Sequence, residues 1–267
     1  MRYFDAHTHI QFPQFDEDRD ELIGAMLEQG VGALVVGVDL DSSRKAVALA
    51  ERYPHLWASI GLHPNDTPEE VFDHAAFSEL ATNPKVRAIG ECGLDNFRPE
   101  DPVATKAKQR ETFEQHIQLA LASDKPLMIH VRPSKGTTDA YEDLIEILTS
   151  YKQEHGEKLR GDIHFFVGGT AEARRIIDLG FTLSFTAVLT FAREYDEVVR
   201  YIPLGSMLTE TDAPYIAPVS RRGKRNDPLA AIDVAKAIAD IRGEDPEAVR
   251  SILLANATRL FQLESPE

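Results

Sequence analysis

The regular alternation of short apolar runs with longer amphipathic segments most constrains the fold of this chain. Short apolar runs predict strands at 3–9, 32–38, 56–63, 86–92, 126–132, 161–167, 181–186 and 207–212, and several of them are nearly continuous runs of apolar and small residues. Helical periodicity separates or follows these runs at 16–29, 43–52, 68–81, 104–122, 138–154, 171–178, 193–200 and 228–241. Strands without polar alternation are typical of a parallel sheet covered on both faces. The pattern therefore predicts an α/β fold, a (β/α)8 TIM barrel.

A doubly wound open sheet would also alternate strands with helices. That fold usually carries a Gly-rich phosphate-binding turn after its first strand, and no such turn follows residues 3–9. No repeat, low-complexity tract or Pro/Gly/Ser-rich linker divides the 267 residues. We therefore expect a single domain over 1–265, with an extra C-terminal helix near 246–261 that packs on the outside.

The start of the third helix is the most clearly marked. Thr67 can cap this helix, Pro68 suits its first position, and Glu70 completes a capping box. We therefore expect the helix to begin at residue 68.

Composition limits the compartment and the partners of the chain. Cys92 is the only cysteine, which excludes an intramolecular disulfide framework and is typical of a reducing compartment. Residues 1–20 do not resemble a secretory signal, and no apolar stretch approaches the roughly 18 residues of a membrane span. The formal charge of −15 argues against a protein that coats nucleic acid non-specifically, although metal ions and a few arginines can still hold phosphates. We expect a cytoplasmic protein with no membrane association and no obligate protein partner.

Histidines and carboxylates gather where the predicted strands end. In a barrel of this kind the reactive side chains lie at the carboxyl ends of the strands. The first strand carries His7 and His9, which alternation places on one face together with Asp5. Later strands carry further candidates at or near their ends: His63, Glu91, His130, His164 within the sixth strand, and Asp212.

These residues form one candidate metal-binding set: His7, His9, Glu91, His130, His164 and Asp212. Each alone has a structural explanation; Glu91, for example, could pair with Arg132. Burying so many titratable groups at one rim costs several kcal/mol each unless they are paired or bind metal, so a shared site explains them better. Imidazole with carboxylate suits zinc, manganese, cobalt or iron better than calcium, and the set is too large for one tetrahedral zinc. We predict two divalent metal ions bridged by Glu91, with Asp212 holding one ion and orienting or deprotonating the attacking water.

Cations near the same rim indicate an anionic substrate. The segment 220–226, "SRRGKRN", carries Arg221, Arg222, Lys224 and Arg225. A solvated basic loop is the simplest explanation, but loops after the last barrel strands commonly hold phosphate. Arg98 and Arg132 follow the fourth and fifth strands. We predict that Arg98, Arg132, Arg222 and Lys224 contact the substrate, and that His63 contacts it or supports a metal ligand.

Seven pieces of the sequence occur together in a familiar order: "FDAHTHI", "GLHPND", "AIGECGLD", "LMIHVR", "IHFFVGG", "LTETDAPY" and "GKRNDP". In these pieces, which span residues 4–228, the chain resembles the TatD-like metal-dependent deoxyribonucleases of the amidohydrolase-like TIM-barrel superfamily. The resemblance implies a two-metal barrel that cleaves phosphodiester bonds in DNA, often with magnesium or manganese. It assigns the same six residues to metal, and Asp212 also to the attacking water.

Three features depart from the family pattern. Val167 replaces a usually small polar residue, Asn96 replaces a common aromatic, and "HVRPSKGTTDA" lengthens the loop after the fifth strand. The metal ligands are unaffected, whereas the substrate pocket is altered. We therefore expect a DNA 3′-5′ exonuclease using magnesium, manganese or zinc. Two alternatives stay open: a metal-dependent hydrolase of a small ester, lactone, amide or phosphotriester, and a non-enzymatic metal-binding protein, against which the apparently complete ligand set argues.

Overall fold

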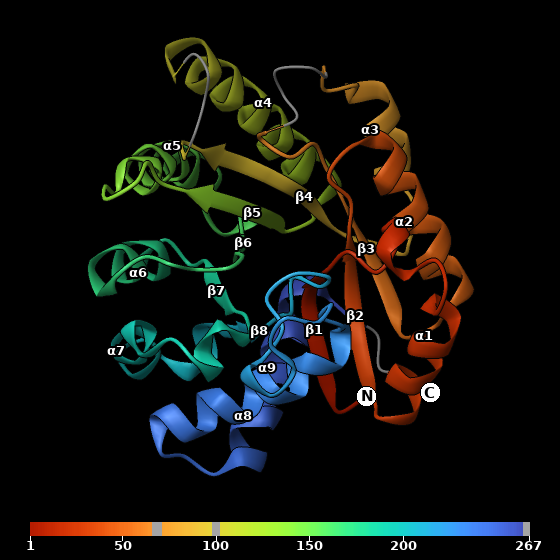
Figure 1. Ribbon diagram of the computed structural model, residues 1–267. Helices are drawn as coiled ribbons and strands as arrows, with labels where there is room; N and C mark the ends of the chain where they lie inside the picture. The colour runs from red at the N-terminus through yellow and green to blue at the C-terminus, as the bar shows by residue number, and fades with distance from the viewer. Residues whose placement is uncertain (66–70, 98–101, 264–267) are drawn as a thin grey trace.

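Eight parallel strands and the helices between them form the computed structural model, which describes residues 1–65, 71–97 and 102–263 (Figure 1). The strands pair in sequential order: β1 Tyr3–Thr8, β2 Val31–Val36, β3 Leu56–Ile60, β4 Val86–Asp95, β5 Leu127–Arg132, β6 Gly161–Ile163, β7 Thr182–Phe185 and β8 Met207–Thr209. The helices are α1 Arg19–Glu28, α2 Leu40–Arg52, α3 His74–Ala81, α4 Pro102–Ser123, α5 Asp139–His155, α6 Thr170–Asp178, α7 Asp196–Tyr201, α8 Ala231–Arg242 and α9 Pro246–Phe261. The predicted (β/α)8 barrel is confirmed. No described helix has the length and apolar character of a membrane span.

The barrel closes where the end of the chain's last strand meets the first. β8 stops at Thr209, and beyond it an isolated parallel bridge joins Thr8 to Ala213. The amide of Asp212 donates to the carbonyl oxygen of His7 at 2.9 Å, and the amide of His9 donates to that of Ala213 at 2.8 Å. This seam brings Asp212 beside the histidines of β1, although they come from opposite ends of the chain.

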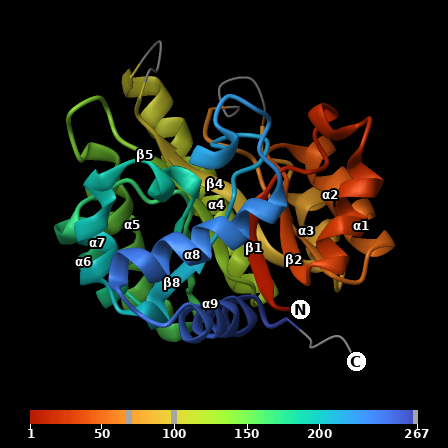
Figure 2. The ribbon, with the colours of Figure 1, turned by 60° about the horizontal axis from the view of Figure 1, so that its bottom comes forward.

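Apolar side chains fill the amino-terminal half of the barrel, and α9 covers its end. Phe4 and Trp57 are buried in one cluster with Phe261 of α9, and the ring of Phe4 lies 5.8 Å from each of the other two rings. Figure 2 shows α9 running beneath the strands. The helix thus lies outside the barrel, as expected, but across the amino-terminal end of the strands. Its apolar residues cover an end that would otherwise expose this cluster to water.

The last three strands are shorter than predicted, and β6 shows the reason. The apolar run predicts a strand to residue 167, but β6 ends at Ile163, so His164 lies just beyond the strand rather than within it. Phe165 has φ +47°, which does not fit a β ladder. Its amide donates to the carboxylate of Glu210 at 2.6 Å. A tertiary contact thus overrides the local preference for strand.

β4 is longer than predicted, so Glu91 lies within the strand rather than at its end. Pairing with β5 is irregular between Ile89 and Cys92. Gly90 has φ +141°, and a Cβ atom there would lie 2.1 Å from the carbonyl oxygen of Met128. Only glycine fits this close approach of two backbones. Glu91 follows directly and presents its carboxylate to the pocket described below.

The third helix begins later than predicted. α3 starts at His74, and the carboxylate of Asp73 caps it by accepting the amide of Ala76 at 3.1 Å. Residues 71–73 are not helical. The predicted capping residues Thr67, Pro68 and Glu70 lie outside the described residues.

Because His116 of α4 is buried, we expect it to make the stability of the protein depend on pH. It is fully buried between the amide of Leu62, which donates to its Nε2 at 3.0 Å, and the carbonyl oxygen of Thr112, 2.8 Å from its Nδ1. Burial lowers the pKa of His116 to about 4. Since its pKa in the unfolded chain is about 6.5, the unfolded state binds more protons between these values. Its contribution to stability is present at neutral pH and is lost as the pH falls from about 6.5 to 4.

His116→Gln keeps an acceptor for Leu62 but does not titrate. We expect the loss of unfolding free energy between pH 7 and pH 5 to be about 2 kcal/mol smaller in the variant than in the wild type. Urea unfolding of both proteins at the two pH values, at the same metal content, measures this difference. Equal losses would contradict the role given to His116.

Candidate metal centre

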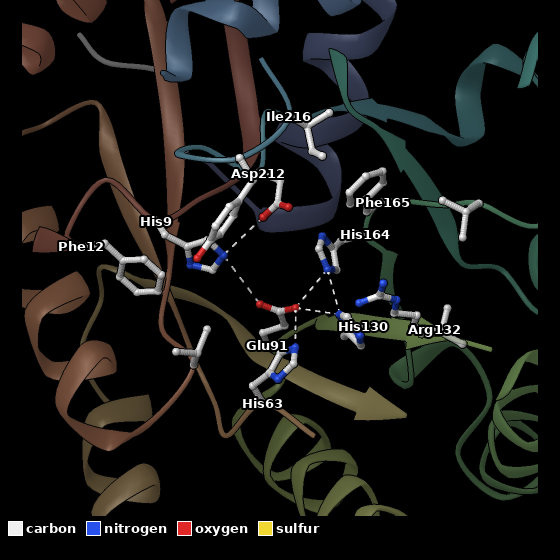
Figure 3. Close-up of a pocket in the computed structure, with 14 residues that line it drawn as sticks. His9, Phe12, His63, Glu91, His130, Arg132, His164, Phe165, Asp212 and Ile216 are labelled. Atoms are coloured by element: carbon white, nitrogen blue, oxygen red, sulfur yellow. Dashed lines mark hydrogen bonds and ion pairs between the residues drawn. The ribbon is translucent and has the colours of Figure 1, made fainter. Parts of the chain in front are cut away.

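A pocket of about 610 Å³ opens at the carboxyl-terminal ends of the strands, and most predicted site residues line it (Figure 3). Its titratable lining consists of His9, His63, Glu91, His130, Arg132, His164, Asp212 and Tyr215. The rest of the lining is apolar: Phe12, Val38, Val131, Phe165, Val167 and Ile216. Of the predicted metal ligands, His7 alone does not line the pocket, being fully buried beside it.

Glu91 lies at the centre of the histidines (Figure 3). Its Oε1 is 3.0 Å from both His130 Nδ1 and His164 Nε2, and 3.4 Å from His63 Nε2. Burial raises the pKa of Glu91, but His164 and His63 outweigh this effect and hold the pKa well below its usual value. The carboxylate is therefore ionised at neutral pH.

The histidine pair of β1 meets the other oxygen of the same carboxylate. The Nε2 atoms of His7 and His9 are 3.1 Å apart, and they lie 3.4 and 3.8 Å from Glu91 Oε2. Asp212 Oδ1 is 3.4 Å from His9 Nε2. His9 Nδ1 lies 2.8 Å from the carbonyl oxygen of Val36, to which it donates, so in the neutral ring the lone pair of Nε2 faces the cluster.

Several features of this cluster suit the binding of metal ions. Three groups of ligand atoms lie within 4.8 Å of one another, formed by His7, His9 and Glu91, by His63, Glu91 and His130, and by His7, His164 and Glu210. The Nδ1 atoms of His7 and His164 are buried without a hydrogen-bond partner among the residues described. Two imidazole nitrogens 3.1 Å apart match ligands that each lie about 2.0–2.1 Å from one ion. Imidazole and carboxylate together suit zinc, manganese or iron.

The site lowers the pKa of some of its histidines and raises the pKa of others. Burial lowers the pKa of His63 to about 3 and that of His7 below its ordinary value, so both are neutral at physiological pH. Burial acts in the same direction on His9, but Asp212 and Glu91 outweigh it and raise the pKa. Metal binding requires neutral imidazole, so a metal must displace protons from the histidines with raised pKa.

Asp95 is a carboxylate that the sequence analysis did not single out. Its Oδ2 lies 3.1 Å from His130 Nε2 and accepts a hydrogen bond from Asn65 Nδ2 at 3.1 Å. Such a carboxylate fixes the ring orientation and the tautomer of a metal-binding histidine. Its position in "AIGECGLD", on the same predicted segment as Glu91, could have identified Asp95 from the sequence.

Glu210 was also missed, although it lies two residues before Asp212. It is fully buried, with Oε1 3.7 Å from His164 Nδ1 and Oε2 accepting from the hydroxyl of Ser184 at 2.7 Å. The same hydroxyl lies 2.5 Å from Asp162 Oδ2. Because a hydroxyl has one proton, one of the two carboxyl groups must carry another. Burial, and then the charge of Glu210, raises the pKa of Asp162 to about 7, so Asp162 can carry this proton near neutral pH.

Asp5 does not join the cluster. Its carboxylate accepts hydrogen bonds from the amide of Thr211 at 2.8 Å, the hydroxyl of Thr211 at 2.6 Å and the amide of His7 at 3.2 Å. The common face predicted for Asp5, His7 and His9 is therefore wrong. The pairing of β1 with β2 is irregular between Asp5 and Thr8, which breaks the simple alternation.

Comparison with known proteins identifies the family. The model described as TatD related DNase matches residues 4–262. The chain belongs to the TatD-related DNase family. The prediction of a TatD-like metal-dependent hydrolase is thereby confirmed.

Individual relatives are similar over nearly their whole length. The uncharacterized metal-dependent hydrolase YabD of Bacillus subtilis is 38% identical over 264 residues, which cover 97% of this chain and 99% of that protein. A protein of Salmonella typhimurium named 3′-5′ ssDNA/RNA exonuclease TatD is 33% identical over 270 residues, with 97% and 99% coverage. The crystal structure of YJJV, a TatD homologue from Escherichia coli K12, has a TM-score of 0.87 at 28% identity and covers 98% of this chain and 99% of its own.

Of the substrate-binding residues predicted for this TatD-family enzyme, His63 and Arg132 line the pocket together. Arg132 lines the pocket, with its guanidinium 3.9 Å from the ring centroid of Phe97. Arg222 and Lys224 are exposed and are not among the described residues that line the pocket; Arg222 lies 4.8 Å over the ring of Phe191. Arg98 lies outside the described residues.

The other two cations of segment 220–226 are paired with carboxylates and hold the loop in place. Arg221 is bonded to Asp227, and Arg225 binds both carboxylate oxygens of Asp18 at 2.9 and 2.5 Å. Arg225 therefore joins the loop after β8 to the loop after β1, which form adjoining walls of the pocket.

Residues that depart from the family pattern have different environments. Val167 lines the pocket, and its amide donates to the hydroxyl of buried Tyr141 at 3.2 Å. Asn96 is buried and does not line the pocket, and its backbone amide donates to the carbonyl oxygen of Arg132 at 2.8 Å. Val167 thus contributes directly to the surface of the pocket, whereas Asn96 supports the strand that carries Arg132.

Proposed function

We propose that this TatD-family enzyme is a 3′-5′ exonuclease that hydrolyses phosphodiester bonds in single-stranded nucleic acid. The observation that carries the proposal is the carboxylate of Glu91 in contact with five histidines at a pocket on the carboxyl-terminal side of the barrel. The similarity to a relative named 3′-5′ ssDNA/RNA exonuclease supports the substrate and the direction of cleavage.

Two divalent ions, magnesium, manganese or zinc, fit this cluster. We propose that His7, His9, Glu91 and Asp212 hold one ion, and that Glu91, His130 and His164 hold the other. His63 lies 3.4 Å from Glu91 Oε1, so we propose it as a further ligand of the second ion as well as a substrate contact. Bound ions of this kind supply Lewis acidity and lower the pKa of coordinated water.

The protein's own side chains would handle the proton and the substrate charge. Burial raises the pKa of Asp212, but the hydrogen bond with His9 outweighs it and keeps the carboxylate ionised. We propose that this carboxylate accepts the proton of the attacking water. Arg132 would contact the phosphate, since the ring of Phe97 orients its guanidinium toward a fixed place on the pocket wall.

A hydrolase of small esters, lactones, amides or phosphotriesters is the second candidate. The pocket's volume of about 610 Å³ lies within the common range for small-molecule sites. Arg132 is the only Lys or Arg among the described residues that line it. A neutral substrate would therefore fit against the apolar part of the lining.

A substrate panel separates the two candidates. Initial rates are measured with a single-stranded oligonucleotide, bis(p-nitrophenyl) phosphate, p-nitrophenyl acetate and a phosphotriester, using Asp212→Asn to identify contaminating activity. We expect kcat/KM for the oligonucleotide to exceed that for each small ester by about 10³-fold, because remote binding energy is available only from the longer substrate. Preference for a neutral ester would overturn the nuclease proposal.

The exposed cations of the loop after β8 predict a salt effect. Arg222→Ala combined with Lys224→Ala should weaken oligonucleotide binding and reduce the slope of log K against log salt by about 1.4, since each phosphate contact on a single strand contributes about 0.7. Fluorescence anisotropy in the presence of chelator measures binding without cleavage. Lys158→Ala with Arg174→Ala is the control, because Arg174 is 71% exposed on α6 and Lys158 precedes β6 at the opposite end of the barrel. An unchanged slope in the first variant would mean that the loop does not hold phosphate.

We further propose a cytoplasmic enzyme in which residues 1–265 act as one catalytic domain, with DNA or RNA as substrate and no obligate protein partner. The single cysteine, Cys92, and the matched range 4–262 support this proposal.

A further inference from the structure

The reaction pocket continues into a second groove. The groove has a volume of about 630 Å³ and shares Phe12, Val38 and Tyr215 with the pocket. It follows the segment after β1 and the start of α2, where its walls include Gln11, Gln14 and Ser42. A ligand that begins beside the metal cluster can therefore extend along the surface into this groove.

Two aromatic rings stand where the pocket and the groove meet. The ring of Phe12 stacks on the imidazole of His9, with centroids 4.6 Å apart and planes 12° from parallel. Figure 3 shows the two side chains beside each other at the edge of the pocket. The ring of Tyr215 lies edge-on to the same imidazole, with centroids 6.5 Å apart. Tyr215 is 49% exposed, so much of its ring surface is available to a ligand. Exposed aromatic rings of this kind stack bases of a single strand with little dependence on sequence.

The polar groups of the groove suit a base and a sugar better than a phosphate. Asp39 caps α2 by accepting the amide of Ser42 at 2.6 Å, and Lys45, the only Lys or Arg among the described residues of the groove, already pairs with Asp41 at 2.6 Å. Gln11 is buried in the groove wall, and its Nε2 donates to the carbonyl oxygen of Val36 at 2.7 Å. The groove thus presents hydrogen-bonding groups beside aromatic rings without a concentration of positive charge.

We propose that this groove is a binding site for the nucleotide next to the 3′-terminal one, with its base stacked on Tyr215. The inference rests on the proposed exonuclease function. An enzyme that removes terminal nucleotides must hold the end of the strand at the cluster while the adjoining nucleotide leaves the pocket. Phe12, Val38 and Tyr215 line both the pocket and the groove, so the adjoining nucleotide can pass from the pocket into the groove along them. The site recognises the presence of a base rather than its identity.

The test combines a change in the enzyme with a change in the substrate. The enzymes are the wild type, Tyr215→Ala, Tyr215→Phe and, as matched control, Tyr201→Ala, since Tyr201 is also 49% exposed but lies on α7. The substrates are oligonucleotides with an abasic residue at the penultimate position, with one six positions from the 3′ end, or with none. KM and kcat are measured with metal, and Kd is measured by anisotropy in chelator.

We expect the penultimate abasic residue to raise KM and Kd of the wild type about tenfold, as loss of one stacked base predicts, with kcat changed far less. Tyr215→Ala should show the same loss with the intact oligonucleotide and no further loss with the abasic one, whereas Tyr215→Phe and Tyr201→Ala should behave like the wild type. An undiminished abasic penalty in Tyr215→Ala would overturn the subsite and leave the exonuclease proposal intact. If the wild type neither binds nor cleaves any oligonucleotide, the proposed function fails and the subsite fails with it.

Discussion

Asp212→Asn is expected to lower kcat on single-stranded DNA by at least about 10³-fold, within the range that a general base contributes. The amide has nearly the shape of the carboxylate but cannot accept the proton of the attacking water. The backbone at this position has φ +52°, a conformation that Asn adopts as readily as Asp, so the substitution adds no strain. The seam hydrogen bond from the amide of residue 212 to His7 is also retained, because it involves only the backbone.

Single-turnover rates on a labelled oligonucleotide measure this effect. Circular dichroism and metal analysis show whether the fold and the bound metal persist. Asp178→Asn is the control, since Asp178 is an exposed carboxylate of α6 paired only with Arg174 among the ion pairs described. Wild-type rates in Asp212→Asn would remove this carboxylate from the reaction.

Glu91→Gln is expected to have the second large effect, which is loss of metal as well as loss of activity. The carboxylate of Glu91 contacts His130 and His164 through one oxygen and His7 and His9 through the other. The neutral amide lacks the negative charge of the carboxylate that all four imidazoles contact, and its NH2 group cannot act as a metal ligand. We expect metal affinity to fall by more than about 100-fold, beyond the effect of removing an outer-shell partner. Activity should fall at least as far as in Asp212→Asn.

Equilibrium dialysis followed by elemental analysis measures the metal bound at several free concentrations. Glu79→Gln is the matched control, because Glu79 is an exposed residue of α3. Wild-type metal content and affinity in Glu91→Gln would show that this carboxylate is not a bridging ligand.

The barrel was predictable from sequence because its signal is local and repeated. Most strands lie in apolar segments that can be recognised without knowledge of their neighbours, and the alternation with helices restricts the topology. The ends of β6 and β4 were not predictable in the same way. β6 stops because the amide of Phe165 binds the carboxylate of Glu210, and β4 is irregular at Gly90 because the backbone of β5 approaches closely. Both causes involve residues far away in the sequence.

The candidate site was predictable only in part, for a related reason. Histidines and carboxylates at strand ends stand out in a sequence, and the barrel geometry brings such ends together. The supporting carboxylates did not stand out, since Asp95 and Glu210 act through His130 and His164 rather than by position alone. The cations of the loop after β8 were grouped by sequence proximity, but the folded chain uses Arg225 to join two loops.

The position of α9 shows a further limit. Its amphipathic pattern predicts that one face is buried, but not which surface covers it. In the structure, Phe261 enters the cluster inside the barrel with Phe4 and Trp57. A sequence pattern cannot distinguish this placement from packing on the outer ring of helices.

The most direct test of the account is cleavage of a 5′-labelled single-stranded DNA oligonucleotide by enzyme stripped of metal with chelator. Magnesium, manganese, zinc or no metal is added in parallel, with Asp212→Asn as the control for contamination. The account predicts a ladder of products shortened stepwise from the 3′ end, present only with metal and absent in the variant. Folded, metal-loaded enzyme that leaves the oligonucleotide intact, or an equal ladder without metal or in the variant, would contradict the claim that this cluster is the metal centre of an exonuclease.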